Sequence, residues 1–175
     1  MDIQAHSVSS SGREKILEHL FVGDLLRCLW RKGIKDAEVL RAEVDSGGYD
    51  LVIECRGVLR HVQLKASHNR ARTARVPVNT RLSRKPSGCV VWMQFNAETL
   101  DLGPFLWLGG RPGEALPELG DRIARHTRAD SLGEKHLRRG VRVVPKSRFS
   151  SFDSIDDIAM ALFGDLNNFG PAKSS

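Results

Sequence analysis

Hydrophobic residues along the first part of the chain recur with the period of an α-helix. From about Gly12 to Arg31 the apolar positions follow a repeat near 3.6 residues, and Gly33 is placed to end the helix. Ser11 and Glu14 have the spacing of a capping box, which is typical of a helix start. The pattern therefore predicts a long amphipathic helix that begins near Gly12, after a flexible lead-in at residues 1–10.

The hydrophobic period then changes to that of β-strands. Two β-rich runs, 49–55 and 58–65, are separated only by Arg56-Gly57, and a two-residue break with glycine second is typical of a hairpin turn. If the turn has two residues, counting back along the ladder places Asp50 directly opposite Gln63. A longer turn would shift this register, so the pairing is a hypothesis.

The rest of the chain continues in short strands and helices. We expect strands at 37–44, 88–96, 102–108 and 141–144, a short helix from Leu116 or Pro117 to Arg128, and a final helix at 154–163. Ser151 or Asp153 is expected to cap this last helix, Gly164 to end it, and residues 165–175 to be flexible. We find neither a linker nor a repeat, so residues 1–175 are expected to form a single domain.

Charge is distributed unevenly along this basic chain. The formal net charge is +6, and the window from Cys55 to Ala97 contains no Asp or Glu. Such a separation attracts polyanions, because Lys and Arg contacts to phosphates supply most of the non-specific affinity for nucleic acids. An ordinary solvated loop with a short helix would also account for the basic residues. The expected nucleic-acid contacts are Arg70, Arg72, Arg75, Arg81, Arg84 and Lys85.

Several classes of protein do not fit the sequence. No apolar run approaches the roughly 20 residues that span a membrane. The start of the chain lacks the apolar core of a secretory signal, so a cytoplasmic location is the default expectation. Cys28, Cys55 and Cys89 have no zinc-like spacing and are expected to be buried, reduced thiols.

Glu18 is the one unusual residue of the predicted helix. At about 100° per residue it lies in the middle of an apolar arc that includes Phe21, Val22, Leu25 and Leu29. A carboxylate that faces a core is costly unless it is paired or binds a metal. Glu18 therefore either passes the helix edge to meet solvent or an arginine, or it points toward a site on the hairpin.

An aspartate at the start of one strand and Gln63-Leu64-Lys65 on the next resemble the motif of the PD-(D/E)XK, or restriction-endonuclease-like, nuclease superfamily. Glutamine replaces the second acid of that motif here. Glu18, Val22 and Leu26 also match the spacing that accompanies a helix glutamate in this family. The resemblance covers roughly Ser11 to Ser67.

The resemblance implies an α/β fold with an αβββαβ core, in which helices flank a mixed central sheet. It also implies a Mg²⁺- or Mn²⁺-dependent endonuclease that hydrolyses phosphodiester bonds of DNA. Asp50, Gln63 and the backbone carbonyl of Leu64 would hold the metal, Lys65 would position the attacking water, and Glu18 would assist at the metal. Cutting both strands often employs two copies in this family, so a homodimer is compatible with the resemblance.

The sequence leaves other functions open. Because Gln63 carries no charge, the chain could be a catalytically inactive nucleic-acid-binding protein with the same fold, or a subunit of a larger assembly. DNA is the partner that the family implies, and RNA remains an alternative that no sequence motif excludes.

Overall fold

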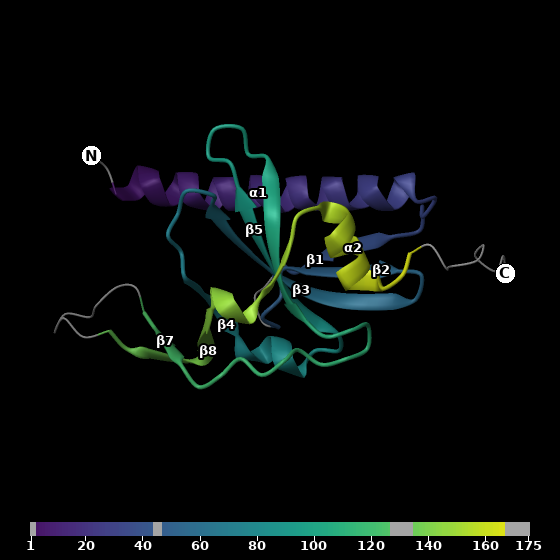
Figure 1. Cartoon of the computed structure of the whole chain (residues 1–175). Coiled ribbons are helices and arrows are strands. Elements are labelled where there is room, and N and C mark those ends of the chain that lie inside the picture. The colour runs from purple at the N-terminus through teal and green to yellow at the C-terminus, as the bar shows by residue number, and fades with distance from the viewer. Residues whose placement is uncertain (1–2, 44–46, 127–134, 167–175) are drawn as a thin grey trace.

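The computed structural model of the chain describes residues 3–43, 47–126 and 135–166, with side chains described from residue 12 onward within these ranges. The described elements form three layers, in which a six-stranded sheet is covered by two helices on one face and by a small three-stranded sheet on the other (Figure 1).

The central sheet is mixed, because β3 and β5 run parallel while the other neighbouring strands are antiparallel. Its strands lie in the order β1-β2-β3-β5-β6-β9. Their bounds are Glu38–Arg41 for β1, Leu51–Cys55 for β2, Val58–His68 for β3, Gly88–Phe95 for β5, Leu102–Gly109 for β6 and Ser150–Phe152 for β9. β5 is buried along both faces, as its continuous apolar run predicts.

Helices α1 (Ile3–Arg31) and α2 (Ile155–Phe163) pack together on one face of this sheet. Phe21, Leu25 and Leu162 are fully buried in the core that they form with the strands. Neither helix is long and apolar enough, over its described residues, to cross a membrane.

The other face of the central sheet is covered by β4 (Arg75–Asn79), β8 (Leu137–Pro145) and β7 (Ile123–Arg125). Two 3₁₀ helices, η1 (Thr80–Arg84) and η2 (Lys146–Arg148), follow β4 and β8. Apolar side chains of the small sheet pack against β5 and β6 in a second core that includes Val76, Val78, Val144, Trp92 and Leu106. β5 and β6 of the central sheet are therefore covered on both faces.

The predicted α/β class with a mixed central sheet is confirmed. The crossover from β3 to β5 contains β4 and η1 instead of an α-helix, so the helices lie on one face and β4 brings the second sheet to the other.

Three of the predicted boundaries are wrong. α1 begins at Ile3, so Ser11 lies inside the helix and does not cap it. The cap of α2 is Ser154, whose hydroxyl accepts the backbone N–H of Asp157 in a capping box. β1 ends at Arg41, which is earlier than the strand predicted for residues 37–44, the last of which lies outside the described residues.

The helix predicted from Leu116 or Pro117 to Arg128 is also wrong. The chain there is irregular up to β7, and residues 127–128 lie outside the described residues. Gly120 has a φ of 79°, which an α-helix does not accommodate. Leu116 and Leu119 are buried in the second core, which explains their helix-like spacing.

The hairpin turn has the two residues that the sequence predicts. Arg56 and Gly57 have φ angles of 50° and 77°, as in a type I′ turn, and Cys55 pairs with Val58. The ladder continues to the pair of Leu51 with Val62, which places Asp50 next along the strand, level with Gln63. The turn therefore sets the register of Asp50 and Gln63.

Alanine at two glycines should have opposite effects on stability. Gly57→Ala forces an L residue into the left-handed region and should lower the free energy of unfolding by about 1 kcal/mol. Gly23 is exposed inside α1 with no atom within 4 Å of an added Cβ, so Gly23→Ala should raise it by about 0.5–1 kcal/mol. Urea unfolding measures both, and a Gly57→Ala protein as stable as the parent would contradict the turn assignment.

Candidate functional site

The site lies where β3 continues beyond the end of its neighbour β2. β2 starts at Leu51, opposite Val62, whereas β3 runs on to His68 and remains paired with β5 along that length. The edge of β3 from residue 64 onward therefore has no β2 partner among the residues of the ladder, and α1 passes over one side of it.

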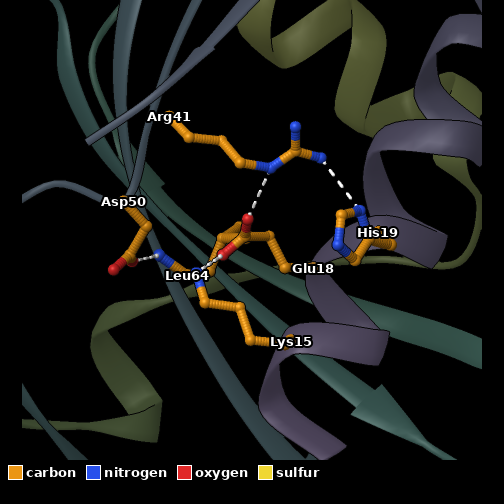
Figure 2. Close-up of polar contacts among 6 residues, drawn as sticks. All are labelled: Lys15, Glu18, His19, Arg41, Asp50 and Leu64. Carbon is orange, nitrogen blue, oxygen red and sulfur yellow. Dashed lines mark hydrogen bonds and ion pairs between the residues drawn. The ribbon is translucent and has the colours of Figure 1, made fainter. Parts of the chain in front are cut away.

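Asp50 closes the ladder at this point. Its backbone N–H donates to the carbonyl of Val62 at 2.9 Å, and its carboxylate Oδ2 accepts the backbone N–H of Leu64 at 2.6 Å (Figure 2). The N–H and C=O of one strand residue point toward the same neighbour. The carbonyl of Leu64 therefore points to the same side as the Asp50 carboxylate.

A cavity of about 500 Å³ opens beside this edge. Its walls come from α1, β3, β4 and β5 and from the residue before β2. The lining includes Glu14, Lys15, Glu18, Asp50, Leu64, Lys65 and Pro77. The structure thus brings together Glu18, Asp50, Leu64 and Lys65, which are up to 47 residues apart in the sequence.

Glu18 is 7% exposed and is paired at both oxygens. Oε1 accepts a hydrogen bond from Nε of Arg41 at 2.8 Å, and Oε2 accepts one from Nζ of Lys15 at 3.1 Å (Figure 2). A further guanidinium nitrogen of Arg41 lies 3.0 Å from Nδ1 of His19. Glu18 therefore meets an arginine and also lines the cavity with Asp50, and its role at a metal remains a prediction.

Gln63 does not belong to the lining of this cavity. Its side chain is buried, and Oε1 accepts the backbone N–H of Asn79 at 3.2 Å. Asn79 in turn caps η1, because its Oδ1 accepts the backbone N–H of Arg81 at 3.0 Å. The structure thus gives Gln63 a contact that fixes the end of β4, and its role as a metal ligand remains a prediction.

Lys65 projects from the same face of β3 as Gln63, since side chains two residues apart share a face. It lies further toward the open end, where the cavity reaches Pro77 of β4. One cavity is therefore bordered by two lysines, Lys15 and Lys65, and by three carboxylates, those of Glu14, Glu18 and Asp50.

The possible metal ligands around the cavity are oxygens, namely the carboxylates of Glu14, Glu18 and Asp50 and the carbonyl of Leu64. Within the described ranges, no group of three or more His, Cys, Asp or Glu side chains is arranged to hold a metal. Mg²⁺ is usually held by one or two carboxylates together with waters and substrate phosphates. The donor set therefore fits Mg²⁺ or Mn²⁺ better than zinc, which prefers nitrogen and sulfur.

The residues predicted to contact nucleic acid follow the site directly in the chain. Five of them are exposed and stand on the loop after β3, on β4 and on η1, namely Arg70, Arg72, Arg75, Arg81 and Arg84. The sixth, Lys85, is half-buried, with its Nζ 5.3 Å from the centre of the Tyr49 ring.

The sequence assigned no role in the site to three charged residues near Glu18, and it gave Glu14 only a capping role, which the start of α1 at Ile3 rules out. Glu14 and Lys15 lie four and three residues before it, so helical spacing alone places them on its face of α1. Arg41 comes from β1, and no local pattern identifies it as the partner of Glu18.

Comparisons with known proteins add little to this geometry. No protein-family model and no curated protein matches the chain. One structurally similar solved protein is a bacterial homing endonuclease, I-Ssp6803I, with 23% sequence identity and a TM-score of 0.26 over 63% of this chain and 77% of that one. The function proposed below therefore depends on the geometry of the cavity.

Proposed function

We propose that this protein is a metal-dependent endonuclease that hydrolyses phosphodiester bonds of DNA in the cavity between α1 and the open edge of β3. One observation carries the proposal: Glu18, Asp50, Leu64 and Lys65 line the same cavity, although they come from α1, from the residue before β2 and from β3. Carboxylate and carbonyl oxygens can hold a divalent cation, which in turn can polarise a phosphoryl oxygen and activate a water molecule.

A bound Mg²⁺ or Mn²⁺ would polarise a phosphoryl oxygen and lower the pKa of the attacking water. Asp50 and the carbonyl of Leu64 would hold it, because both face the same gap and the hydrogen bond from Leu64 fixes the carboxylate. Oriented ligands bind without first losing side-chain freedom, which is an advantage for a site with few charges.

Lys65 would supply positive charge at the cavity. An ammonium group there attracts the phosphate and offsets the negative charge that grows on its oxygens in the transition state. Lys65 could also orient the water by a hydrogen bond. Glu18 would accept hydrogen bonds from water on the α1 side, while Arg41 and Lys15 hold its carboxylate in place.

The charge of the chain supports a nucleic-acid substrate. The net charge of +6 and the acid-free window that begins after Glu54 place basic residues on the segments next to the cavity. Phosphate contacts from such residues supply sequence-independent affinity for DNA.

A second candidate function is a nucleic-acid-binding protein of the same architecture without catalysis. Two observations favour it. Glu18 is already neutralised by Arg41 and Lys15, and Gln63 accepts a hydrogen bond from Asn79. The experiments that follow separate the two functions.

Purified protein should nick or cut plasmid DNA in Mg²⁺ or Mn²⁺, and EDTA should stop the reaction. Lys65→Ala and Asp50→Asn should each lower the rate by about 10²–10³-fold, as is typical when one charge-stabilising group is removed. Gel analysis of plasmid forms measures the rates, with single-stranded DNA and RNA as further substrates.

Matched controls for these two variants are Lys35→Ala and Asp24→Asn, which change the same residue types outside the cavity. Both should cut at the parental rate. Equal cleavage by Lys65→Ala and the parent would point to a contaminant. Binding of DNA without cleavage by the parent would favour the non-catalytic function.

Two variants at Gln63 distinguish support of β4 from metal binding. Gln63→Leu leaves the Asn79 N–H without its acceptor and should lower the free energy of unfolding by about 1–3 kcal/mol. Gln63→Glu keeps an acceptor and should leave Mn²⁺ affinity, measured by calorimetry, within about twofold of the parent. A tenfold gain in affinity, equivalent to about 1.4 kcal/mol, would instead identify position 63 as a ligand.

Removing the positive charge of Arg41 should strengthen metal binding. Arg41 is partly exposed and lies 2.8 Å from Glu18, so its loss makes the cavity more negative. We expect the free energy of Mn²⁺ binding to improve by at most about 1 kcal/mol, which is roughly fivefold in affinity. Arg27→Gln breaks an exposed ion pair with Asp24 outside the cavity and should have no effect. Weaker Mn²⁺ binding by Arg41→Gln than by the parent would show that Glu18 does not contribute to the metal site.

A further inference from the structure

A second cavity, of about 420 Å³, lies on the small sheet. Its walls come from three separate segments, which are the start of β4, the loop before β7, and the end of β8 with η2. Three arginines line it, one from each segment, namely Arg75, Arg122 and Arg148.

Two directly paired residues of the small sheet line the two cavities. Pro77 of β4 lines the first cavity, and Val143 of β8, its direct partner in the ladder, lines the second. Arg75 lies two residues before Pro77 and therefore on the same face of β4. Directly opposed residues in an antiparallel pair also share a face, so Arg75, Pro77 and Val143 lie on one face of the small sheet.

The arginines are exposed, and the backbone around them is held in place. Arg148 donates a hydrogen bond from Nη2 to the carbonyl of Glu118. The carbonyl of Arg122 accepts the backbone N–H of Val143 at 2.8 Å, which ties the loop to β8. Guanidinium groups suit phosphate because their N–H donors match its oxygens in pairs. Asp121 is the carboxylate in the lining, and it opposes this attraction.

We propose that the arginine cavity is a phosphate subsite, which binds the sugar–phosphate backbone of the DNA strand that enters the first cavity. This inference rests on the proposed function, because it assigns the same substrate to both cavities. Arg75 and Pro77 are about 7 Å apart along β4, whereas phosphates of one strand rise about 3.4 Å each along the duplex axis. The subsite therefore lies within a few nucleotides of the proposed scissile bond.

Charge-matched variants test the subsite through binding alone. Affinity for a fluorescent duplex DNA of 30 base pairs is measured by anisotropy in EDTA, so that cleavage does not interfere, at several salt concentrations. Arg122→Ala and Arg148→Ala should each weaken binding several-fold and reduce the slope of log affinity against log salt by about 1, the value expected for one lost phosphate contact. Arg148→Lys should recover only part of the affinity, because lysine lacks the paired donors.

One variant that removes a negative charge from the cavity and two control variants outside it complete the test. Asp121→Asn should tighten binding, since it removes the negative charge from the cavity. Arg27→Ala and Asp24→Asn change the same charges on α1, outside both cavities, and should leave affinity and salt slope near those of the parent.

The outcomes separate this inference from the proposed function. If Arg122→Ala and Arg148→Ala bind like Arg27→Ala, or if the parent does not bind duplex DNA, the subsite is wrong. If the arginine variants lose affinity while the parent never cleaves DNA in Mg²⁺ or Mn²⁺, the subsite holds and the endonuclease proposal fails.

Discussion

The hydrogen bond from the backbone of Leu64 to the carboxylate of Asp50 is the contact on which the site depends. It forms where β3 extends beyond the start of β2, and a side-chain carboxylate accepts the hydrogen bond that a backbone carbonyl would accept in a continuing ladder. Ladder hydrogen bonds on both sides fix the position of this carboxylate. A rigid acid beside a strand carbonyl is therefore a direct consequence of the hairpin register, which the two-residue turn at Arg56-Gly57 sets.

The layers of the fold place different charged groups at the two cavities. Glu18 of α1 is paired with Lys15 of the same helix and with Arg41 of β1, whereas the second cavity is lined by three arginines and by no carboxylate other than Asp121. Neutralising Glu18 lowers the cost of burying a carboxylate. The same pairing also reduces the negative charge available to a metal ion, so the balance between folding and binding at this residue is set by Arg41 and Lys15.

Local patterns predicted the parts of the molecule that depend on local physics. Positive-φ turn residues fixed the hairpin register, and the 3.6-residue period placed Glu18 on the buried side of α1. The helix expected near Leu116 is absent, because Leu116 and Leu119 are buried in the second core from an irregular segment and their spacing resembles that of one helix face. The pairing of Arg41 with Glu18 could not be foreseen, since it joins two segments whose relative position only the folded sheet defines.

The most direct test of the account is a crystal structure of the protein with bound Mn²⁺, located by its anomalous scattering. The account predicts a Mn²⁺ peak within coordination distance of the Asp50 carboxylate and the Leu64 carbonyl, which should disappear in crystals of Asp50→Asn. A strong Mn²⁺ peak at another place, with none beside Asp50 at concentrations that saturate the protein in solution, would contradict it.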